Sequence, residues 1–110
     1  ADEDFVVAGY IKKGGHMYSL VLAKYKGNTL IFRGYVTSGV TKEAIDTLEV
    51  TGKNPFPFDA YSGEHDVIWV KTNHVCVVEY MPNLINSLRQ PVFKGFRDDV
   101  LPKEVQASEA

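Results

Sequence analysis

The sequence of 110 residues contains a single cysteine and no long apolar run. Cys76 has no second cysteine to pair with, so an internal disulfide is excluded and a reducing compartment is favoured. No apolar stretch approaches the roughly 20 residues that a membrane-spanning helix needs. The opening, Ala1-Asp2-Glu3-Asp4, is acidic and unlike a signal peptide. We therefore expect a cytoplasmic protein, and the lack of an initiator methionine favours a piece of a longer chain.

Complete catalytic and metal-binding motifs are also missing. The three histidines and Cys76 do not occur at any usual zinc-ligand spacing, so no metal site is predicted and each histidine is interpreted as a surface or turn residue. There is no Walker loop and no GxSxG nucleophile motif. The acid–base cluster at 64–66 lies in a glycine-flanked loop without a neighbouring nucleophile. We expect no complete active site within these residues.

What is present is the composition of one small globular domain. Hydrophobic residues make up 45% and charged residues 24% of the sequence, which excludes wholesale disorder. The formal net charge is −2, but the segment from Phe5 to Val40 has five basic residues and no acidic one. A local positive field attracts a polyanion whatever the net charge is. The alternative interpretation, to which we give equal weight, is that lysine is simply common on solvent-exposed strands. The five residues are Lys12, Lys13, Lys24, Lys26 and Arg33.

Runs rich in β-branched and aromatic residues predict an antiparallel meander in the first forty residues. We expect strands at 5–13, 17–26 and 29–36, separated by the turn signals Gly14-Gly15 and Gly27-Asn28. Gly34 inside the third strand indicates a bulge. A short helix is predicted over 41–50, with Thr41 as its N-cap.

The second half predicts a loop followed by further strands. Residues 51–66 form the loop, in which Phe56 and Phe58 are expected to be buried rather than exposed. Strands follow at 67–71, 74–80 and 89–96. This order predicts a mainly β protein, a small five-stranded OB-fold barrel (Greek key) with one short helix after the third strand. An SH3-like barrel or a short sandwich would fit the strand count as well.

The stretch from 89 to 102 resembles the final motif of ATP-dependent DNA ligases, R-x-P-x-F-x-G-x-R-x-D-K-x-P. The opening at 4–10 is similar to the entry to the C-terminal domain of that family, and 69–71 with 75–80 resemble the preceding strand pair. The likeness is closest to bacterial end-joining ligases and implies an OB-fold. Seven motif positions match: Arg89, Pro91, Phe93, Gly95, Arg97, Asp99 and Pro102.

The resemblance implies a domain organisation and a reaction. Residues 1–4 would be a hinge or linker remnant, 5–97 the OB-fold domain, and 98–110 a charged tail that frays unless it docks. A ligase of this family transfers AMP from ATP to a lysine, then to a 5′-phosphate, and then seals the nick. That lysine belongs to a preceding adenylation domain, which would also bind most of the ATP and Mg²⁺. We expect the isolated domain to be monomeric, inactive and without a bound cofactor.

The resemblance also implies roles for single residues. Arg97 would stabilise charge on the departing pyrophosphate, and Asp99 would orient it. The lysine after the motif aspartate is Val100 here, so Lys103 is the candidate substitute cation. Asp4 matches a hinge position, although an acidic spacer is the plainer reading. The five basic residues of the meander would contact duplex DNA at the nick through phosphates.

Two other functions remain open at this point. The first is the matching domain of an RNA ligase or capping enzyme, which shares the fold and the adenylyl or guanylyl chemistry. A free-standing OB-fold module for single strands is the second alternative, because such modules stack bases on exposed aromatic side chains. Tyr18, Tyr25, Phe32 and Tyr35 are the candidates for that role.

Overall fold

A computed structural model describes residues 1–81 and 88–108 of the chain, and most of its regular structure is β-strand. The three predicted strands of the meander and the helix after the third strand are confirmed. No helix in the described part of the chain is long and apolar enough to cross a membrane. The elements are β1 (Asp2–Gly14), β2 (Met17–Lys26), β3 (Thr29–Val36), α1 (Lys42–Asp46), β4 (Ile68–Trp69), β5 (Val75–Met81), β6 (Arg89–Arg97) and the 3₁₀ helix η1 (Pro102–Glu104).

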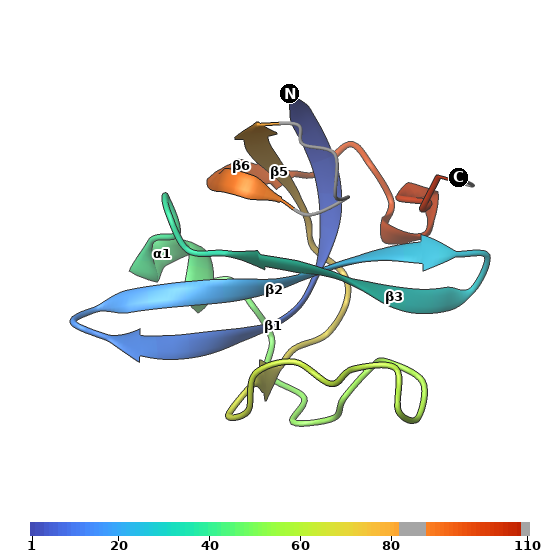
Figure 1. The fold of residues 1–110 in the computed structure, drawn as a ribbon, viewed down its shortest axis with the longest axis horizontal. Coiled ribbons are helices and arrows are strands. Elements are labelled where there is room, and N and C mark those ends of the chain that lie inside the picture. Colours follow the sequence, from blue (N-terminus) through green and yellow to red (C-terminus); the bar gives the residue numbers. More distant parts are fainter. Residues whose placement is uncertain (82–87, 109–110) are drawn as a thin grey trace.

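The strands form one six-stranded sheet in the order β3-β2-β1-β5-β6, with β4 paired to β1 (Figure 1). The five longer strands follow the predicted OB-type order, and β4 is the sixth. Beyond β3 the chain meets β6 through a single parallel bridge, in which the Phe93 amide donates to the Ser38 carbonyl at 2.8 Å. No ladder joins β3 to β6 in the described residues, so the sheet curls without closing. The fold is thus mainly β and OB-like.

Two glycines permit close crossings in this curled sheet. A Cβ on Gly9 would lie 2.7 Å from Val67 and 2.8 Å from the Ile68 carbonyl oxygen, so only glycine allows β4 to pair so closely with β1 there. Gly39 has a φ of +86°, and a Cβ on it would lie 2.5 Å from the Phe93 carbonyl oxygen. The bulge predicted at Gly34 is confirmed by a register shift between Leu22 and Ala23 in the β2–β3 ladder.

The inner face of the sheet holds the first of two apolar cores. Phe5, Leu20 and Leu22 are fully buried there. Helix α1 covers one end of this core through Ala44 and Ile45, and Leu48 just beyond the helix joins them. The predicted N-cap is confirmed, because the Thr41 hydroxyl accepts a hydrogen bond from the Ala44 amide at 3.1 Å.

The outer face of the sheet holds the second core, which loop 51–66 and the C-terminal segment cover. Figure 1 shows the loop, coloured green to yellow, running below β1. Phe56 packs into this core and is 6% exposed, as predicted. Phe58 is 94% exposed, so its predicted burial is wrong. Pro57 separates Phe58 from the anchored Phe56, and Phe58 lies outside the second core.

Both ends of the described chain are attached to the sheet. Asp2 to Asp4 continue β1 and pair with Glu79 to Val77 on β5. The C-terminal segment docks on β2, because the Tyr25 amide donates to the Val105 carbonyl at 2.8 Å and the Ala107 amide donates to the Tyr25 carbonyl at 2.7 Å. The Val105 side chain is 5% exposed, and its burial stabilises the docked segment in addition to these hydrogen bonds. The functional division into linker, domain and tail stays a prediction.

Candidate functional site

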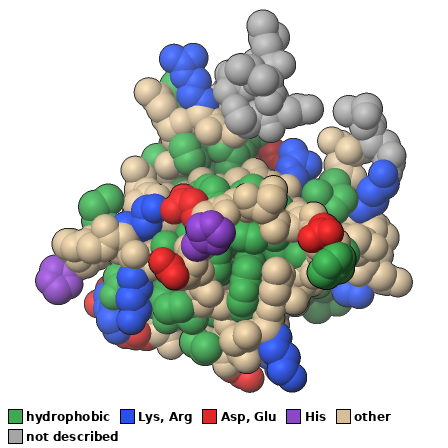
Figure 2. All heavy atoms as spheres, turned by 60° about the horizontal axis from the view of Figure 1, so that its bottom comes forward, with side chains coloured by type: hydrophobic (Ala, Val, Ile, Leu, Met, Phe, Trp, Pro, Cys, Tyr) green, Lys and Arg blue, Asp and Glu red, His purple; other side chains and the backbone are tan. Residues whose placement is uncertain are grey.

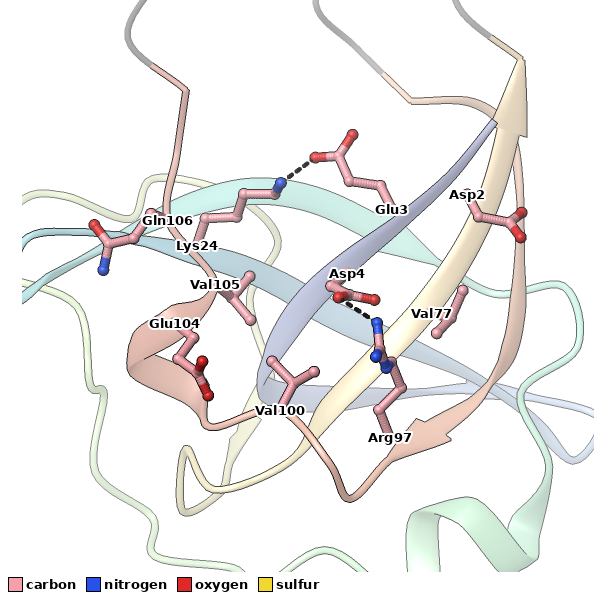
Figure 3. Close-up of a pocket in the computed structure, with 10 residues that line it drawn as sticks. All are labelled: Asp2, Glu3, Asp4, Lys24, Val77, Arg97, Val100, Glu104, Val105 and Gln106. Carbon is pink, nitrogen blue, oxygen red and sulfur yellow. Dashed lines mark hydrogen bonds and ion pairs between the residues drawn. The ribbon is translucent and has the colours of Figure 1, made fainter.

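Arg97, the last residue of β6, is held by two carboxylates. Its Nε and Nη2 donate to the two oxygens of Asp99 at 3.1 and 2.9 Å, which is a bidentate fork. Its Nη1 donates to Asp4 Oδ2 at 2.9 Å, across the sheet from β1. Figure 3 shows the Arg97 side chain extending toward Asp4 over the strand that carries Val77.

Strand register explains why these residues meet. Asp4 pairs with Val77 on β5, and Val77 pairs with Gly95 on β6. Residues two apart on a strand share a face, so Arg97 lies on the same face as Gly95 and Asp4. Gly95 has no side chain, and nothing lies within 4 Å of the place a Cβ would take. The face therefore stays open beside Arg97.

The electrostatics of the cluster favour its charged forms. Hydrogen bonds to Asp99 and Asp4 raise the pKa of Arg97 above its ordinary value. The same fork lowers the pKa of the Asp99 carboxyl. The Arg97 side chain is 37% exposed, so its own domain compensates its charge without enclosing it. A phosphate group could reach this guanidinium by displacing one of the two carboxylates.

Arg97 and Asp4 lie in a cavity of about 650 Å³ between β1, β5 and the docked C-terminal segment (Figure 3). Its described lining carries four carboxylates and two cations, so the cavity is acidic. The charged residues are Asp2, Glu3, Asp4, Glu104, Lys24 and Arg97.

The structure does not place Lys103 beside Arg97. Its Nζ lies 5.1 Å from the centre of the Tyr25 ring and donates to Asn28 Oδ1 at 3.1 Å, by the β2–β3 turn. The Gln106 side chain, which accepts from the Gly27 amide at 3.0 Å, fixes the tail there. This placement gives no support to Lys103 as the substitute for the missing lysine.

The basic residues of the meander do not form one patch. Lys12 and Lys13 lie near the β1–β2 turn, and Lys26 lies at the other end of β2, next to the β2–β3 turn. Figure 1 shows these two turns at opposite ends of the meander. The ten residues of β2 span about 30 Å at the usual rise per residue. On the face drawn in Figure 2, basic side chains are interspersed with acidic ones.

Two of the predicted DNA contacts are engaged inside the domain. Lys13 pairs with Glu64 at 2.6 Å, which ties the β1–β2 hairpin to loop 51–66. Lys24 pairs with Glu3 and lies 5.2 Å from the centre of the Phe5 ring, with only 13% of its side chain exposed. Lys12 and Lys26 remain exposed, and Arg33 is half-buried.

The aromatic residues that would stack single-stranded bases are used in packing. Tyr25 is 7% exposed, and Phe32 makes edge-to-face contacts with Tyr35 and Tyr61, each with ring centres 5.1 Å apart. The Tyr35 and Tyr61 hydroxyls are 2.7 Å apart, and burial of Tyr61 helps to raise its pKa. Loop 51–66 therefore covers the strand face that OB-folds use for oligonucleotides. This arrangement argues against the single-strand module.

A second cavity, of about 550 Å³, borders Arg97 from the other side. It lies between the residue after α1 and the segment that follows β6, and His74 and Phe96 line it. Sequence reasoning treated His74 only as a surface or turn residue. The only sequence signal for His74 is its position at the start of the predicted strand at 74–80. In the structure its neighbour Val75 pairs with Arg97 on β6, which brings His74 close to the motif arginine.

A resident metal is not suggested by the donor groups that the structure describes. Among residues 1–81 and 88–108, no three histidine, cysteine or acidic side chains converge so that they could hold a metal ion. Cys76 is fully buried, and burial raises the pKa of its thiol to about 12. A thiol in that state is neither a ligand nor a nucleophile at neutral pH.

Comparisons with known proteins give one family and a set of solved structures. The family model for the "ATP dependent DNA ligase C terminal region" matches residues 13–100. The ligase domain of M. tuberculosis LigD matches with a TM-score of 0.79 and 23% identity, over 98% of this chain and 39% of that chain. A mycobacterial DNA ligase D complexed with ATP and MES matches with a TM-score of 0.74 and 27% identity, over 98% of this chain and 38% of that chain. No match was found among curated proteins. The chain thus spans well under half of either ligase structure.

Proposed function

The chain belongs to the family of ATP-dependent DNA ligase C-terminal regions, and we propose that it is the OB-fold domain of such a ligase, working with an adenylation domain of the same protein. It would supply Arg97 to the adenylation of the ligase lysine and would contact duplex DNA at the nick. Joining nicks in this way serves DNA repair and recombination in the cytoplasm of a bacterium.

The bidentate fork between Arg97 and Asp99 is the observation that carries this proposal. Two hydrogen bonds hold the guanidinium in one plane, and its planar set of donors matches the oxygens of a phosphate. Its remaining hydrogen bond goes from Nη1 to Asp4 on β1. Asp4 is in the strand that opens the domain, so this ion pair links the proposed hinge to Arg97.

The residues of this domain fit ATP better than they fit a metal. Arg97 suits the oxygens of the pyrophosphate end, where it would compensate the charge that develops as pyrophosphate departs. Mg²⁺ would supply further charge compensation from the adenylation domain. Lys12 and Lys26 would neutralise phosphates of the duplex without reading its sequence.

The proposal is tested with Arg97→Ala in the full-length ligase. We expect lysine adenylation to slow by roughly 10²–10³-fold, as when a charge-stabilising donor is removed. Sealing of a pre-adenylated nick should change by less than about tenfold, because that step needs no departing pyrophosphate. Asp99→Asn should give a smaller loss in adenylation, since it leaves the guanidinium but removes its orienting charge.

Lys94→Ala is the matched control, because Lys94 is an exposed cation on the same strand. It should leave both steps within about twofold of the parent enzyme. Equal losses in adenylation and sealing for Arg97→Ala would contradict the assignment.

A further inference from the structure

Among the described residues, Arg97 is the one charged side chain that lines both the cavity containing Asp4 and the cavity containing His74. These two cavities differ in charge. In the cavity that contains Asp4, four carboxylates stand against two cations in the described lining. In the cavity that contains His74, Asp98 is the one carboxylate and Arg97 the one guanidinium among the described residues. Because like charges repel, a polyanion is disfavoured on the Asp4 side and approaches Arg97 more readily from the His74 side.

The His74 side also offers a group that can become a second cation. The imidazole packs against the Phe96 ring, with centres 5.1 Å apart, and His74 Nδ1 lies 3.0 Å from Asn73 Oδ1. A carbonyl oxygen only accepts, so Nδ1 carries the hydrogen and Nε2 is free to take up a proton. The His74 carbonyl accepts a bond from the Val7 amide at 3.1 Å, which fixes the segment against β1.

The other candidates for a second cation are absent from this cavity. Val100 contributes an apolar side chain to it, and Lys103 is held at the β2–β3 turn. His74 is partly buried, and that burial lowers its pKa, so the empty cavity favours the neutral ring. A bound anion has the opposite effect on an adjacent imidazole.

We propose that the cavity lined by His74, Phe96 and Arg97 receives the phosphate chain of an inorganic polyphosphate or nucleoside triphosphate, with His74 as the second binding residue beside Arg97. This inference rests on the proposed function and names a further residue of the same site. The charged groups that face His74 in the cavity are Arg97 and Asp98. Anion binding therefore couples to protonation of His74 and strengthens as the pH falls toward 6.

Inorganic pyrophosphate is the probe, and the ¹H resonances of the histidine rings are the readout. With saturating pyrophosphate, the titration midpoint of His74 should move to higher pH than in sodium chloride of equal ionic strength. His74→Phe keeps the packing on Phe96 and removes the nitrogen. It should weaken pyrophosphate binding at pH 6 by about threefold to tenfold and at pH 8 by less than about twofold. His65→Phe, the same change at an exposed histidine of loop 51–66, should bind like the parent chain.

Two outcomes separate this inference from the function on which it rests. If Arg97→Ala abolishes pyrophosphate binding while the His74 midpoint does not move and His74→Phe binds normally, the role of His74 is refuted and the role of Arg97 stands. If Arg97→Ala leaves lysine adenylation unchanged in the full-length ligase, the proposed function itself fails. A shifted midpoint together with pH-dependent weakening in His74→Phe supports the inference.

Discussion

The two charged regions that the sequence singles out are arranged very differently in space. Arg97 meets Asp4, 93 positions away, and Asp99 in one cluster at the edge of β6. The five basic residues of the meander, close together in sequence, are spread along two long hairpins, and two of them are paired with acids. Nearness in sequence therefore did not predict nearness in space.

The difference follows from strand geometry. A hairpin separates residues along its length, so lysines on one strand are spread over its whole extent. A sheet brings together residues from remote segments whenever their registers align, as they do for Asp4, Val77 and Gly95. If the basic residues of the meander are indeed spread out and partly paired, substituting each one should have a different effect on stability and on DNA binding.

The largest effect is expected for Lys24→Met, and on stability rather than on DNA binding. The change keeps the apolar stem over Phe5 but leaves Glu3 without its cation. We expect a loss of about 1–2 kcal/mol in the free energy of unfolding at pH 7, measured by urea denaturation. The affinity for nicked duplex should not change, and a clear fall in affinity would show that Lys24 contacts DNA.

The pH dependence of this loss has a definite sign. Burial raises the pKa of Glu3, but hydrogen bonds from Lys24 and Tyr80 outweigh it, so the pKa lies below its ordinary value of 4.5. The contribution of the pair is fully present above that ordinary value and is lost as the pH falls through the lowered one. The parent and Lys24→Met should therefore differ less at about pH 3 than at pH 7.

A moderate effect on DNA binding is expected for the exposed Lys26. Lys26→Ala should weaken binding of the chain to nicked duplex about twofold to fivefold and reduce the slope of log affinity against log salt by about one. Lys12→Ala should act in the same way at the other end of the hairpin. Fluorescence anisotropy over a salt series measures both quantities, and an unchanged slope for both variants would remove the meander from the DNA interface.

The smallest effect is expected for Glu64→Gln, which frees Lys13 without removing it. The affinity for duplex should rise about twofold at low salt, and the gain should vanish at high salt because surface pairs are screened. Glu43→Gln on α1 changes the net charge equally but lies outside the Lys13 contact. A similar rise in both variants would mean that net charge, and not the release of Lys13, is responsible.

Local patterns were sufficient for much of the fold. The runs rich in β-branched and aromatic residues and the glycine turns located β1, β2 and β3, and Thr41 marked the helix N-terminus. The same signals failed where burial is decided by distant contacts. Phe56 and Phe58 stand two positions apart in the same loop, yet one is buried and the other exposed. Nothing in the short sequence around them says which of the two meets Phe32 and Trp69.

The sequence by itself predicted the order of the strands along the chain and, through seven matching motif positions, the family, and it singled out Arg97 as the candidate phosphate-binding side chain. Only the tertiary structure decided the partners of that side chain, the place of Lys103 at a remote turn and the cavity that joins Arg97 to His74. Turns, helix caps and strands depend on interactions between residues that are close along the chain, so the local sequence predicts them. Charge pairing and cavity lining depend on the register between strands, which the whole sheet sets at once.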